Sequence, residues 1–368
     1  MSYYEVYNRY KNINLNKDSY VSQSCIEQTL ASDDVSVEQF ANLLVPYSED
    51  CLEKIAQCAH QLTLRYFGKT IQLYTPMYLS NYCDNQCVYC GFNLQNKIER
   101  KRLELEEVEK EAKFIQATGL KHILVLTGES RTKSPVSYIK DSIKILKKYF
   151  SSIAVEIYPL TEEEYGQLVK EGAEGLTIYQ ETYNENIYKE IHLSGPKSNY
   201  KFRLDAPERG ASAGMRSVNI GVLLGLTDWR KDIFFLGLHA KYLQDKFSDV
   251  EIGVSIPRIR KQVSNFQAGF NVSDKDIVQI ILALRIFLPR LSISLSTRES
   301  SSLRDNLLPL GITRMSAGSS TYVGGHTLDT TGHFGQFEIC DKRSVEEMKS
   351  MLEEKGYQPV LKDWMHLV

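Results

Sequence analysis

The feature that most constrains the fold is a repeated alternation of short apolar runs with segments of helical periodicity. Eight runs rich in β-branched and apolar residues recur, at 71–79, 122–128, 153–160, 175–182, 218–226, 251–259, 291–299 and 311–318. Helix-period segments lie between them, for example at 105–119, 137–150 and 161–172, and several close on a glycine. Near-continuous apolar strands that alternate with helices are typical of a parallel sheet covered on both faces. Eight such units predict an α/β fold, a closed (β/α)8 barrel of the TIM type rather than an open doubly wound sheet.

The rest of the chain predicts an extension at each end of this barrel. A chain of 368 residues is long enough to bury one large core. Residues 1–65 precede the first strand and show helical patterns, so we expect an N-terminal helical extension there. The barrel is expected at 66–320, and residues 321–368 are expected to complete it with a final helix and a tail.

Charge and hydropathy exclude several classes of partner. The most apolar segment, 276–291, contains Arg285 and is too short to span a bilayer. It is interpreted as a buried helix that begins in a capping box of Ser273 and Asp276. The net charge is −2 and the pI about 6.4, so no basic footprint indicates nucleic acid. Because the polar N-terminus lacks the apolar core of a signal peptide, we expect a reducing, cytoplasmic location and no membrane partner.

Three of the seven cysteines, Cys83, Cys87 and Cys90, lie within eight positions directly after the first predicted strand. The other four are scattered and are expected to pack in the interior: Cys25, Cys51, Cys58 and Cys340. Structural zinc sites usually have four ligands, and only a distant residue such as Cys58 or His60 would supply the fourth. A non-enzymatic zinc-binding module is therefore one alternative. Thiolates are also the normal ligands of iron–sulfur clusters, and three of them would leave one iron of a 4Fe–4S cluster open to a small molecule.

Polar and charged residues lie where the predicted strands end, which is where barrels of this type carry their chemistry. These residues include Gly128, Glu129, Glu181, Thr182, Arg258, Arg298, Glu299 and Ser316. They are expected to form an active-site rim, although strand ends are also where any chain returns to water.

The spacing Cys-x3-Cys-x2-Cys, with Tyr89 before the last cysteine, resembles the signature of the radical S-adenosylmethionine (SAM) superfamily. A Gly-Phe that follows the cluster and a downstream Gly-Glu at Gly128 strengthen the resemblance. The resemblance implies that the open iron of a 4Fe–4S cluster chelates the amino and carboxylate groups of SAM. One electron from the cluster then cleaves SAM to give a 5′-deoxyadenosyl radical.

From about residue 70 to the end, the chain is similar to the aromatic amino-acid lyases of this superfamily, most of all to the tyrosine lyases of thiazole synthesis (2-iminoacetate synthases). The matching stretches include "PMYLSNYCDNQCVYCGF", "YQETYNENIYKEIHLSGPKSNYKFR", "LSISLSTRES", "SAGSSTYVGG" and "PVLKDW". The tyrosine lyase that matures iron hydrogenases is also closely similar, but it carries a C-terminal extension with further cysteines. Here Cys340 is the only cysteine after Cys90, so a second cluster is not expected and the thiazole branch is preferred. The chain departs from the family pattern at Leu193, Lys261 and His326.

The resemblance implies roles for several strand-end residues toward SAM. Cys83, Cys87 and Cys90 are the cluster ligands, and Tyr89 belongs to the same cofactor-binding loop. Gly128 would let the backbone approach the amino group of SAM, with Glu129 accepting hydrogen bonds, although a plain turn would also place a glycine there. Glu181 and Arg203 resemble the carboxylate and guanidinium pair that orients SAM, and a surface ion pair is the alternative.

Three further residues are implied at the substrate end of the site. Arg298 is the best candidate for binding the substrate carboxylate, because a guanidinium fork binds both oxygens. Ser316 and Ser319 would add hydrogen bonds to the substrate or would cap helices. His239 and Tyr242, at helical spacing, are expected to pack in the interior.

The reaction implied by the family cleaves the Cα–Cβ bond of L-tyrosine to give p-cresol and 2-iminoacetate (dehydroglycine) for the thiazole of thiamine. The implied partners are L-tyrosine, a thiazole synthase, a sulfur carrier protein and a reductase or flavodoxin-type electron donor. Another radical SAM lyase, acting on tryptophan or serving hydrogenase maturation, is the alternative within the superfamily.

Overall fold

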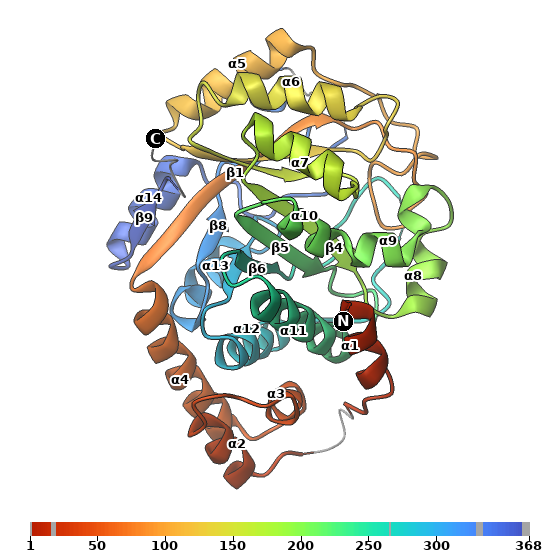
Figure 1. The fold of residues 1–368 in the computed structure, drawn as a ribbon. Helices are drawn as coiled ribbons and strands as arrows, with labels where there is room; N and C mark the ends of the chain where they lie inside the picture. The colour runs from red at the N-terminus through yellow and green to blue at the C-terminus, as the bar shows by residue number, and fades with distance from the viewer. Residues whose placement is uncertain (1, 16–19, 265, 329–333, 363–368) are drawn as a thin grey trace.

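A computed structural model describes residues 2–15, 20–264, 266–328 and 334–362 of the chain. Eight parallel strands form a closed barrel (Figure 1), because β1 pairs with both β2 and β8 and every other strand pairs with its neighbours in sequence. The strands are β1 (Thr70–Ser80), β2 (His122–Thr127), β3 (Ser152–Glu156), β4 (Gly175–Glu181), β5 (Ser217–Val222), β6 (Glu251–Ser255), β7 (Ser292–Leu295) and β8 (Arg314–Ser316). The predicted fold class is confirmed, and each strand lies within or overlaps one of the eight apolar runs.

Helices follow the strands and cover the outside of the barrel. They are α5 (Leu105–Ala117), α6 (Val136–Leu146), α7 (Glu162–Glu171), α8 (Glu185–Ile191), α9 (Tyr200–Leu204), α10 (Ala206–Ser212), α11 (Trp229–Lys246), α12 (Asp274–Phe287) and α13 (Ser301–Leu307). Two short 3-10 helices lie at Pro196–Ser198 and Leu308–Leu310. The backbone at Gly172 is left-handed, with φ of 117°, which is why α7 ends there.

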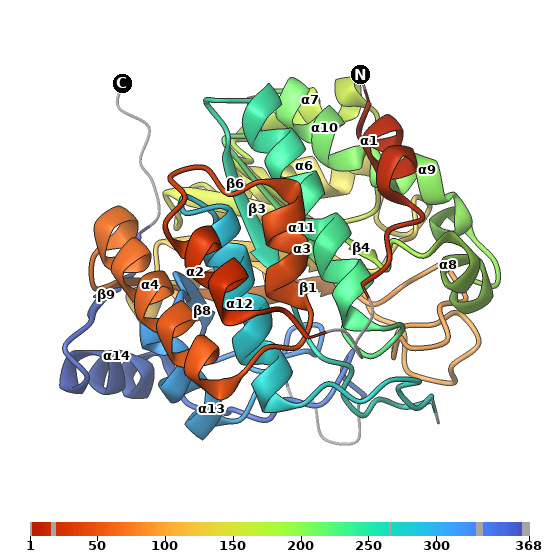
Figure 2. The ribbon, with the colours of Figure 1, turned by 90° about the horizontal axis from the view of Figure 1, so that it is seen from below.

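Four helices precede the barrel: α1 (Tyr3–Tyr10), α2 (Gln23–Leu30), α3 (Val37–Leu44) and α4 (Glu49–Phe67). Figure 2 shows α2, α3 and α4 gathered beside α12. The ring of Phe40 stacks on Phe287 of α12, with 4.1 Å between the ring centroids. The amide of Gln279 donates hydrogen bonds to the carbonyls of Leu43 and Val45, both at 3.0 Å. The helical character of this extension agrees with the prediction, whereas the domain boundaries at residues 65 and 320 stay predictions.

The C-terminal segment adds one helix and one strand. Helix α14 (Val345–Glu354) is the expected final helix, and β9 (Gln358–Val360) pairs with the beginning of β1. Strand β9 was not predicted, because three residues carry too little periodicity to be recognised. Asp363 and Trp364, the end of the matching stretch "PVLKDW", lie outside the described residues.

The structure places the capping box of α12 and His239 as predicted, but not Cys340. The capping box of Ser273 and Asp276 begins α12, as predicted. His239 is buried and stacks on Tyr3 with centroids 3.8 Å apart, so its packing role is confirmed. Cys340 was expected in the interior and is exposed, so that expectation was wrong. The reason is that it lies in a connection outside the barrel, where its amide donates to the carbonyl of Thr297. Among the described residues, no helix is long and apolar enough to cross a membrane.

Candidate active site

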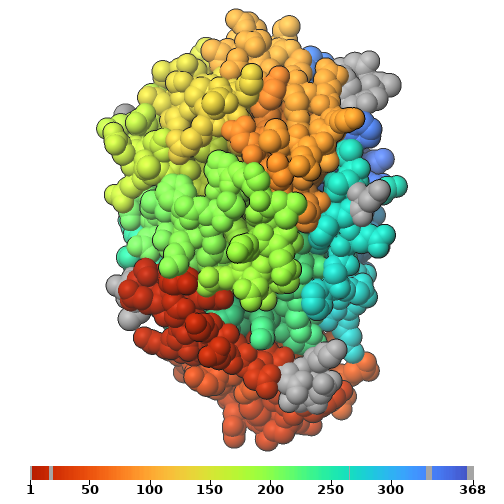
Figure 3. Space-filling view, turned by 90° about the vertical axis from the view of Figure 1, so that its right-hand side faces the viewer, coloured from red at the N-terminus to blue at the C-terminus, as the bar shows by residue number. Residues whose placement is uncertain are grey.

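One large cavity opens at the carboxyl ends of the barrel strands. Its empty volume is about 1530 Å³ with the solvent-filled mouth included, which is enough for two small molecules together. Figure 3 shows the cysteine loop (80–100, orange), α8 and α9 (green) and the segment at 258–264 (cyan) meeting on one face of the molecule. All eleven predicted site residues line this cavity: Cys83, Cys87, Tyr89, Cys90, Gly128, Glu129, Glu181, Arg203, Arg298, Ser316 and Ser319. The barrel thus brings them together, while the role of each stays a prediction.

The cysteine loop is held in place by backbone contacts with neighbouring segments. The amide of Asp84 donates to the carbonyl of Glu129 at 3.0 Å, and the amide of Val88 donates to that of Ile191 at 3.1 Å. The guanidinium of Arg100 donates to the carbonyls of Asn81 and Phe92, at 2.7 and 2.9 Å, and to further carbonyls of the same loop. An irregular loop therefore has its polar backbone satisfied and presents its thiols in a defined arrangement.

The three thiols fit an iron–sulfur cluster better than a single metal ion. Within the described ranges, no three His, Cys, Asp or Glu side chains converge as ligands of one ion do. A zinc ion needs its thiolates about 2.3 Å away on one centre, whereas an iron–sulfur cluster takes each thiolate on a separate iron. The distant zinc ligands weighed above do not reach the cavity: His60 bonds to the carbonyl of Pro309, and Cys58 packs against the core. Burial raises the pKa of the Cys83 thiol to about 11, so the thiols need a bound metal to lose their protons.

Two buried ion pairs lie beside the cysteine loop. Lys197 donates to Glu181 at 2.7 Å, and Arg203 donates to Glu129 at 2.8 Å. Burial opposes ionisation of both carboxyls, but the neighbouring Arg203 and Lys197 outweigh it and lower the pKa of each. The sequence analysis expected Glu181 opposite Arg203; the structure pairs them differently and adds Lys197, which sequence reasoning missed. The feature of the sequence that could have indicated Lys197 is its position directly after a Gly-Pro pair in the matching stretch "HLSGPKSNY".

Glu181 lies in a strained backbone conformation. Its φ of 70° makes it the one non-glycine residue with positive φ among the described residues, and the β4–β5 register shifts at this point. Such conformations are uncommon and persist where the surrounding structure enforces them, often at functional sites. The bulge turns this carboxylate into the cavity toward Lys197.

Tyr89 of the cysteine motif is oriented by His192. Burial lowers the pKa of His192 to about 2, so its ring is neutral. The Nδ1 of His192 lies 2.8 Å from the carbonyl of Tyr188, and its Nε2 lies 2.8 Å from the Tyr89 hydroxyl. Since a carbonyl only accepts, Nδ1 carries the proton and Nε2 accepts from Tyr89, a tautomer assigned from these partners.

Gly128 has a structural reason to be glycine. A Cβ at this position would overlap the carbonyl of Tyr82 in the cysteine loop, and the amide of Gly128 donates to the carbonyl of Ser80 at 2.7 Å. The close approach of the cysteine loop therefore requires a glycine here, and the predicted approach of this backbone to SAM stays a prediction. Gly128 still lines the cavity beside Glu129.

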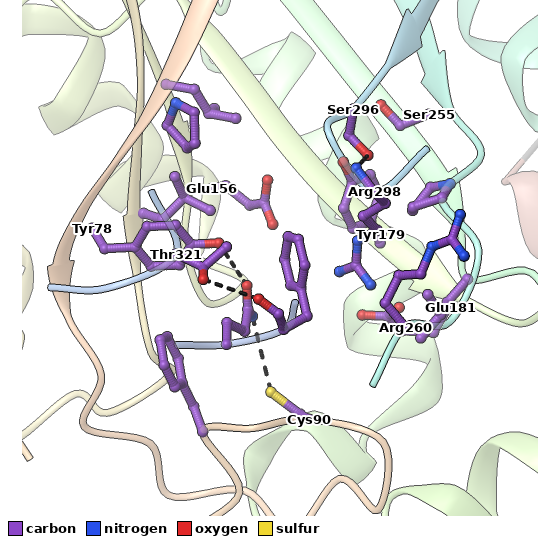
Figure 4. Close-up of a pocket in the computed structure, with 18 of the residues that line it drawn as sticks. Tyr78, Cys90, Glu156, Tyr179, Glu181, Ser255, Arg260, Ser296, Arg298 and Thr321 are labelled. Atoms are coloured by element: carbon purple, nitrogen blue, oxygen red, sulfur yellow. Dashed lines mark hydrogen bonds between the residues drawn. The ribbon is translucent and has the colours of Figure 1, made fainter. Parts of the chain in front are cut away.

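Arg298 is a buried cation that lines the cavity without an acidic partner in the described part of the chain. Among the described residues no carboxylate lies within 4.0 Å of it, and its guanidinium lies 3.5 Å from the ring centroid of Phe337. Burial lowers its pKa. Arg258, which was also predicted at the rim, does not line the cavity and is engaged with Glu299 and Asp274. Figure 4 shows Arg298, Arg260 and Glu181 on one side of the cavity and Tyr78 and Glu156 on the other.

The two serines differ in their availability. The hydroxyl of Ser316 accepts the amide of Thr297 at 3.0 Å, which positions the loop that carries Arg298. The hydroxyl of Ser319 is buried and has no partner in the described structure, so it is free for a ligand. Neither serine caps a helix in the described chain, since Ser300 and Ser344 cap the two nearest helices.

Glu156 is a second residue that the sequence analysis missed. It ends β3 and faces the cavity. Burial, and then the negative charge of Glu181, raise its pKa to about 7. The signal available in the sequence was a carboxylate inside the apolar run "IAVEIYPL".

Comparison with known proteins agrees with this geometry. The family model "Radical SAM superfamily" matches residues 77–236, and "Biotin and Thiamin Synthesis associated domain" matches residues 255–358. The chain is 38% identical to a 2-iminoacetate synthase of Salmonella typhimurium over 340 residues, covering 92% of this chain and 90% of the relative. It is 37% identical to the 2-iminoacetate synthase of Escherichia coli over the same shares. The X-ray structure of the FeFe-hydrogenase maturase HydG from Carboxydothermus hydrogenoformans matches with a TM-score of 0.86 and 34% identity, covering 98% of this chain and 82% of that one.

Proposed function

Because this chain belongs to the radical SAM superfamily, and within it to the family of the 2-iminoacetate synthases, we propose that it cleaves the Cα–Cβ bond of L-tyrosine. The products are p-cresol and 2-iminoacetate, and the reaction serves thiamine biosynthesis. The chain is a carbon–carbon lyase. The observation that carries the assignment is this family membership, joined to one cavity that is lined by the three cysteines and by Arg298, which no carboxylate of the described residues pairs with.

The proposed cofactors are a 4Fe–4S cluster and SAM. Cys83, Cys87 and Cys90 would hold three irons, and their spread over one loop suits a cluster rather than a single ion. When bound and reduced, the cluster and SAM supply the 5′-deoxyadenosyl radical that removes a hydrogen atom from the substrate. The thiolates and the strong reductant that this needs are expected in the cytosol.

The buried charges next to the cysteine loop are proposed to hold SAM. SAM carries an ammonium and a carboxylate on its methionine portion, and the site offers two carboxylates and two cations. Glu129 and Glu181 suit the ammonium, while Lys197 and Arg203 suit the carboxylate. Because ion pairs within the chain hold these four groups in place, they are preorganised and need little ordering when the ligand binds.

Arg298 is proposed to bind the carboxylate of tyrosine, with the Ser319 hydroxyl as an additional donor. A buried guanidinium without a carboxylate partner is costly, and a substrate carboxylate removes that cost. Binding of the carboxylate at Arg298 holds the substrate in one orientation inside a cavity shielded by the surrounding loops. Radical chemistry depends on such placement and on the exclusion of water.

Product analysis tests the proposal. The protein is reconstituted anaerobically with iron and sulfide, supplied with SAM and dithionite, and given tyrosine or tryptophan. We expect about four irons per chain, and p-cresol and 5′-deoxyadenosine from tyrosine alone. An indole product from tryptophan, without p-cresol from tyrosine, would assign the chain to a tryptophan-type lyase instead.

A role in hydrogenase maturation is the second candidate function, because 98% of the chain aligns with the structure of a hydrogenase maturase. Both functions begin with the same cleavage of tyrosine. We propose the thiazole branch, with a thiazole synthase, a sulfur carrier protein and a reductase or flavodoxin-type donor as partners. Transfer of 2-iminoacetate to a thiazole synthase, measured as thiazole formed, separates the two.

A further inference from the structure

The topology of the barrel sets Glu156 opposite Arg298. In the closed order of eight strands, β3 is four strands from β7 in either direction. Glu156 is the last residue of β3, and Arg298 follows β7 by three positions. Residues at the ends of strands that are half a barrel apart face each other across the mouth. Figure 4 shows the two side chains on opposite sides of the same open space.

Glu156 has no partner that explains its presence. Among the described residues no hydrogen bond or ion pair within 4.0 Å engages its carboxyl group, although it lines the cavity. The nearby Tyr78 hydroxyl is engaged, because it donates to Gln336 at 2.7 Å. An unpaired carboxyl group in a cavity is costly, so it points to a ligand that supplies the missing partner.

The space between the two charged groups suits an aromatic ring. Arg298 and Glu156 act on each other electrostatically, yet they are too far apart to form an ion pair, so a gap separates them. Apolar side chains line the cavity in this region, among them Leu126, which lies beside Glu156 in the β2–β3 register, and Ile157. Tyrosine carries its carboxylate at one end and its phenol hydroxyl at the other, with a rigid apolar ring between them.

We propose that Glu156 accepts the hydrogen bond of the phenol hydroxyl of bound tyrosine and so selects tyrosine over phenylalanine; this assignment rests on the proposed function. The carboxylate of the substrate lies on Arg298, the ring crosses the cavity, and the hydroxyl reaches the end of β3. The pKa of Glu156 is about 7, so both protonation states are present at neutral pH, and each state offers an oxygen that accepts a hydrogen bond from the phenol hydroxyl.

The ammonium group of tyrosine is bonded to the same carbon as its carboxylate, so it lies on the Arg298 side of the cavity when Arg298 binds the carboxylate. Figure 4 shows Arg298 and Glu156 on different sides of the cavity. Glu156, on the opposite wall, is left for the far end of the substrate.

Ligand binding tests the assignment without turnover. Calorimetry on the protein loaded with cluster and SAM, but not reduced, measures the affinities for L-tyrosine, L-phenylalanine and 3-(4-hydroxyphenyl)propanoate. In the wild type we expect tyrosine to bind about 10- to 150-fold more tightly than phenylalanine, the range of one hydrogen bond to a charged group. Glu156→Met removes the acceptor at similar volume and should reduce this ratio to near one. Glu156→Gln keeps a carbonyl oxygen and should retain an intermediate ratio.

Iron content and SAM affinity serve as folding controls, because Glu156 touches neither site in this proposal. If Glu156→Met fails to load iron, Glu156→Asp, which withdraws the acceptor by one carbon, should also lower the ratio. An unchanged preference for tyrosine in these variants overturns the assignment. The assignment is also overturned if a variant loses its preference for tyrosine over 3-(4-hydroxyphenyl)propanoate, which lacks the ammonium group, because Glu156 would then bind the ammonium. If the wild type forms no p-cresol, it is the proposed function that fails; if the wild type forms p-cresol but the ratio is unmoved, only the role of Glu156 fails.

Discussion

Replacement of Arg298 by lysine separates substrate binding from cofactor chemistry. The variant keeps a positive charge at the end of β7 but loses the planar fork that binds both oxygens of a carboxylate. The guanidinium also lies 3.5 Å from the ring centroid of Phe337, a contact that a flexible ammonium would hold less well. Because no acidic side chain of the described chain pairs with Arg298, the change should leave the other ion pairs of the cavity intact.

The size of the effect follows from the bonds that are lost. One charge-assisted hydrogen bond contributes about 1.5–3 kcal/mol, which is roughly a 10- to 150-fold increase in KM for tyrosine in Arg298→Lys. Arg298→Met leaves the substrate carboxylate buried without a partner, which costs about 2–5 kcal/mol, or roughly a 30- to 4000-fold loss. Since radical chemistry depends on placement, the yield of p-cresol should fall further than binding does.

The assay measures 5′-deoxyadenosine and p-cresol side by side, together with iron content. In Arg298→Lys we expect normal iron content and continued slow cleavage of SAM, with p-cresol reduced relative to 5′-deoxyadenosine. Arg131→Lys, at an exposed arginine that pairs with Glu164, is the matched control and should behave as the wild type. Wild-type rates of both products in Arg298→Lys would refute the reasoning, because Arg298 would then be a structural strand-end residue.

Three further predictions concern the cluster, SAM and the fold. Alanine at Cys83, Cys87 or Cys90 should abolish iron binding and SAM cleavage, while alanine at any other cysteine should not; iron analysis of all seven variants decides this. Glu181→Gln should weaken SAM binding in equilibrium dialysis and leave iron content unchanged, and equal SAM affinity would remove this residue from the site. Burial lowers the pKa of His239 to about 3, so the unfolded state binds more protons below pH 6.5 and stability falls as the pH falls from there toward 3, by about 1.4 kcal/mol per pH unit. His239→Gln should flatten the slope of unfolding free energy against pH in this range, and an unchanged slope would show that the histidine is not buried in its neutral form.

Much of the fold was predictable because its signals are local. The eight apolar runs and the helical periods between them each span fewer than about 20 residues, so the chain alone indicates strand, helix and their alternation. The capping box of Ser273 and Asp276 is another signal of this kind, and it begins α12 as predicted. Strand β9 was not predictable from local pattern, because its pairing with β1 depends on a partner almost 300 positions away.

The cysteine motif and the rim residues were also predictable, since a barrel gathers all of its strand ends at one mouth. The sequence did not predict which of these rim residues pair with another side chain and which are available to a ligand. Arg258 and Arg298 look alike in sequence, yet Glu299 engages the first and leaves the second open to a ligand. Gly128 was expected to face SAM, and its lack of a side chain is already required by the cysteine loop.

The sequence by itself therefore indicated the barrel, the cysteine motif and part of the rim, because periodicity and close spacing need no distant partner to be recognised. It missed Lys197 and Glu156, and two residues that it placed on the rim, Thr182 and Arg258, do not line the cavity. Only the tertiary structure decided that Glu129 pairs with Arg203 across 74 positions, that Lys197 takes Glu181, and that Glu156 faces Arg298. The physical reason is competition. Buried charges pair with whichever opposite charge the closed barrel brings nearest, and that distance is set by strand order and not by any local pattern.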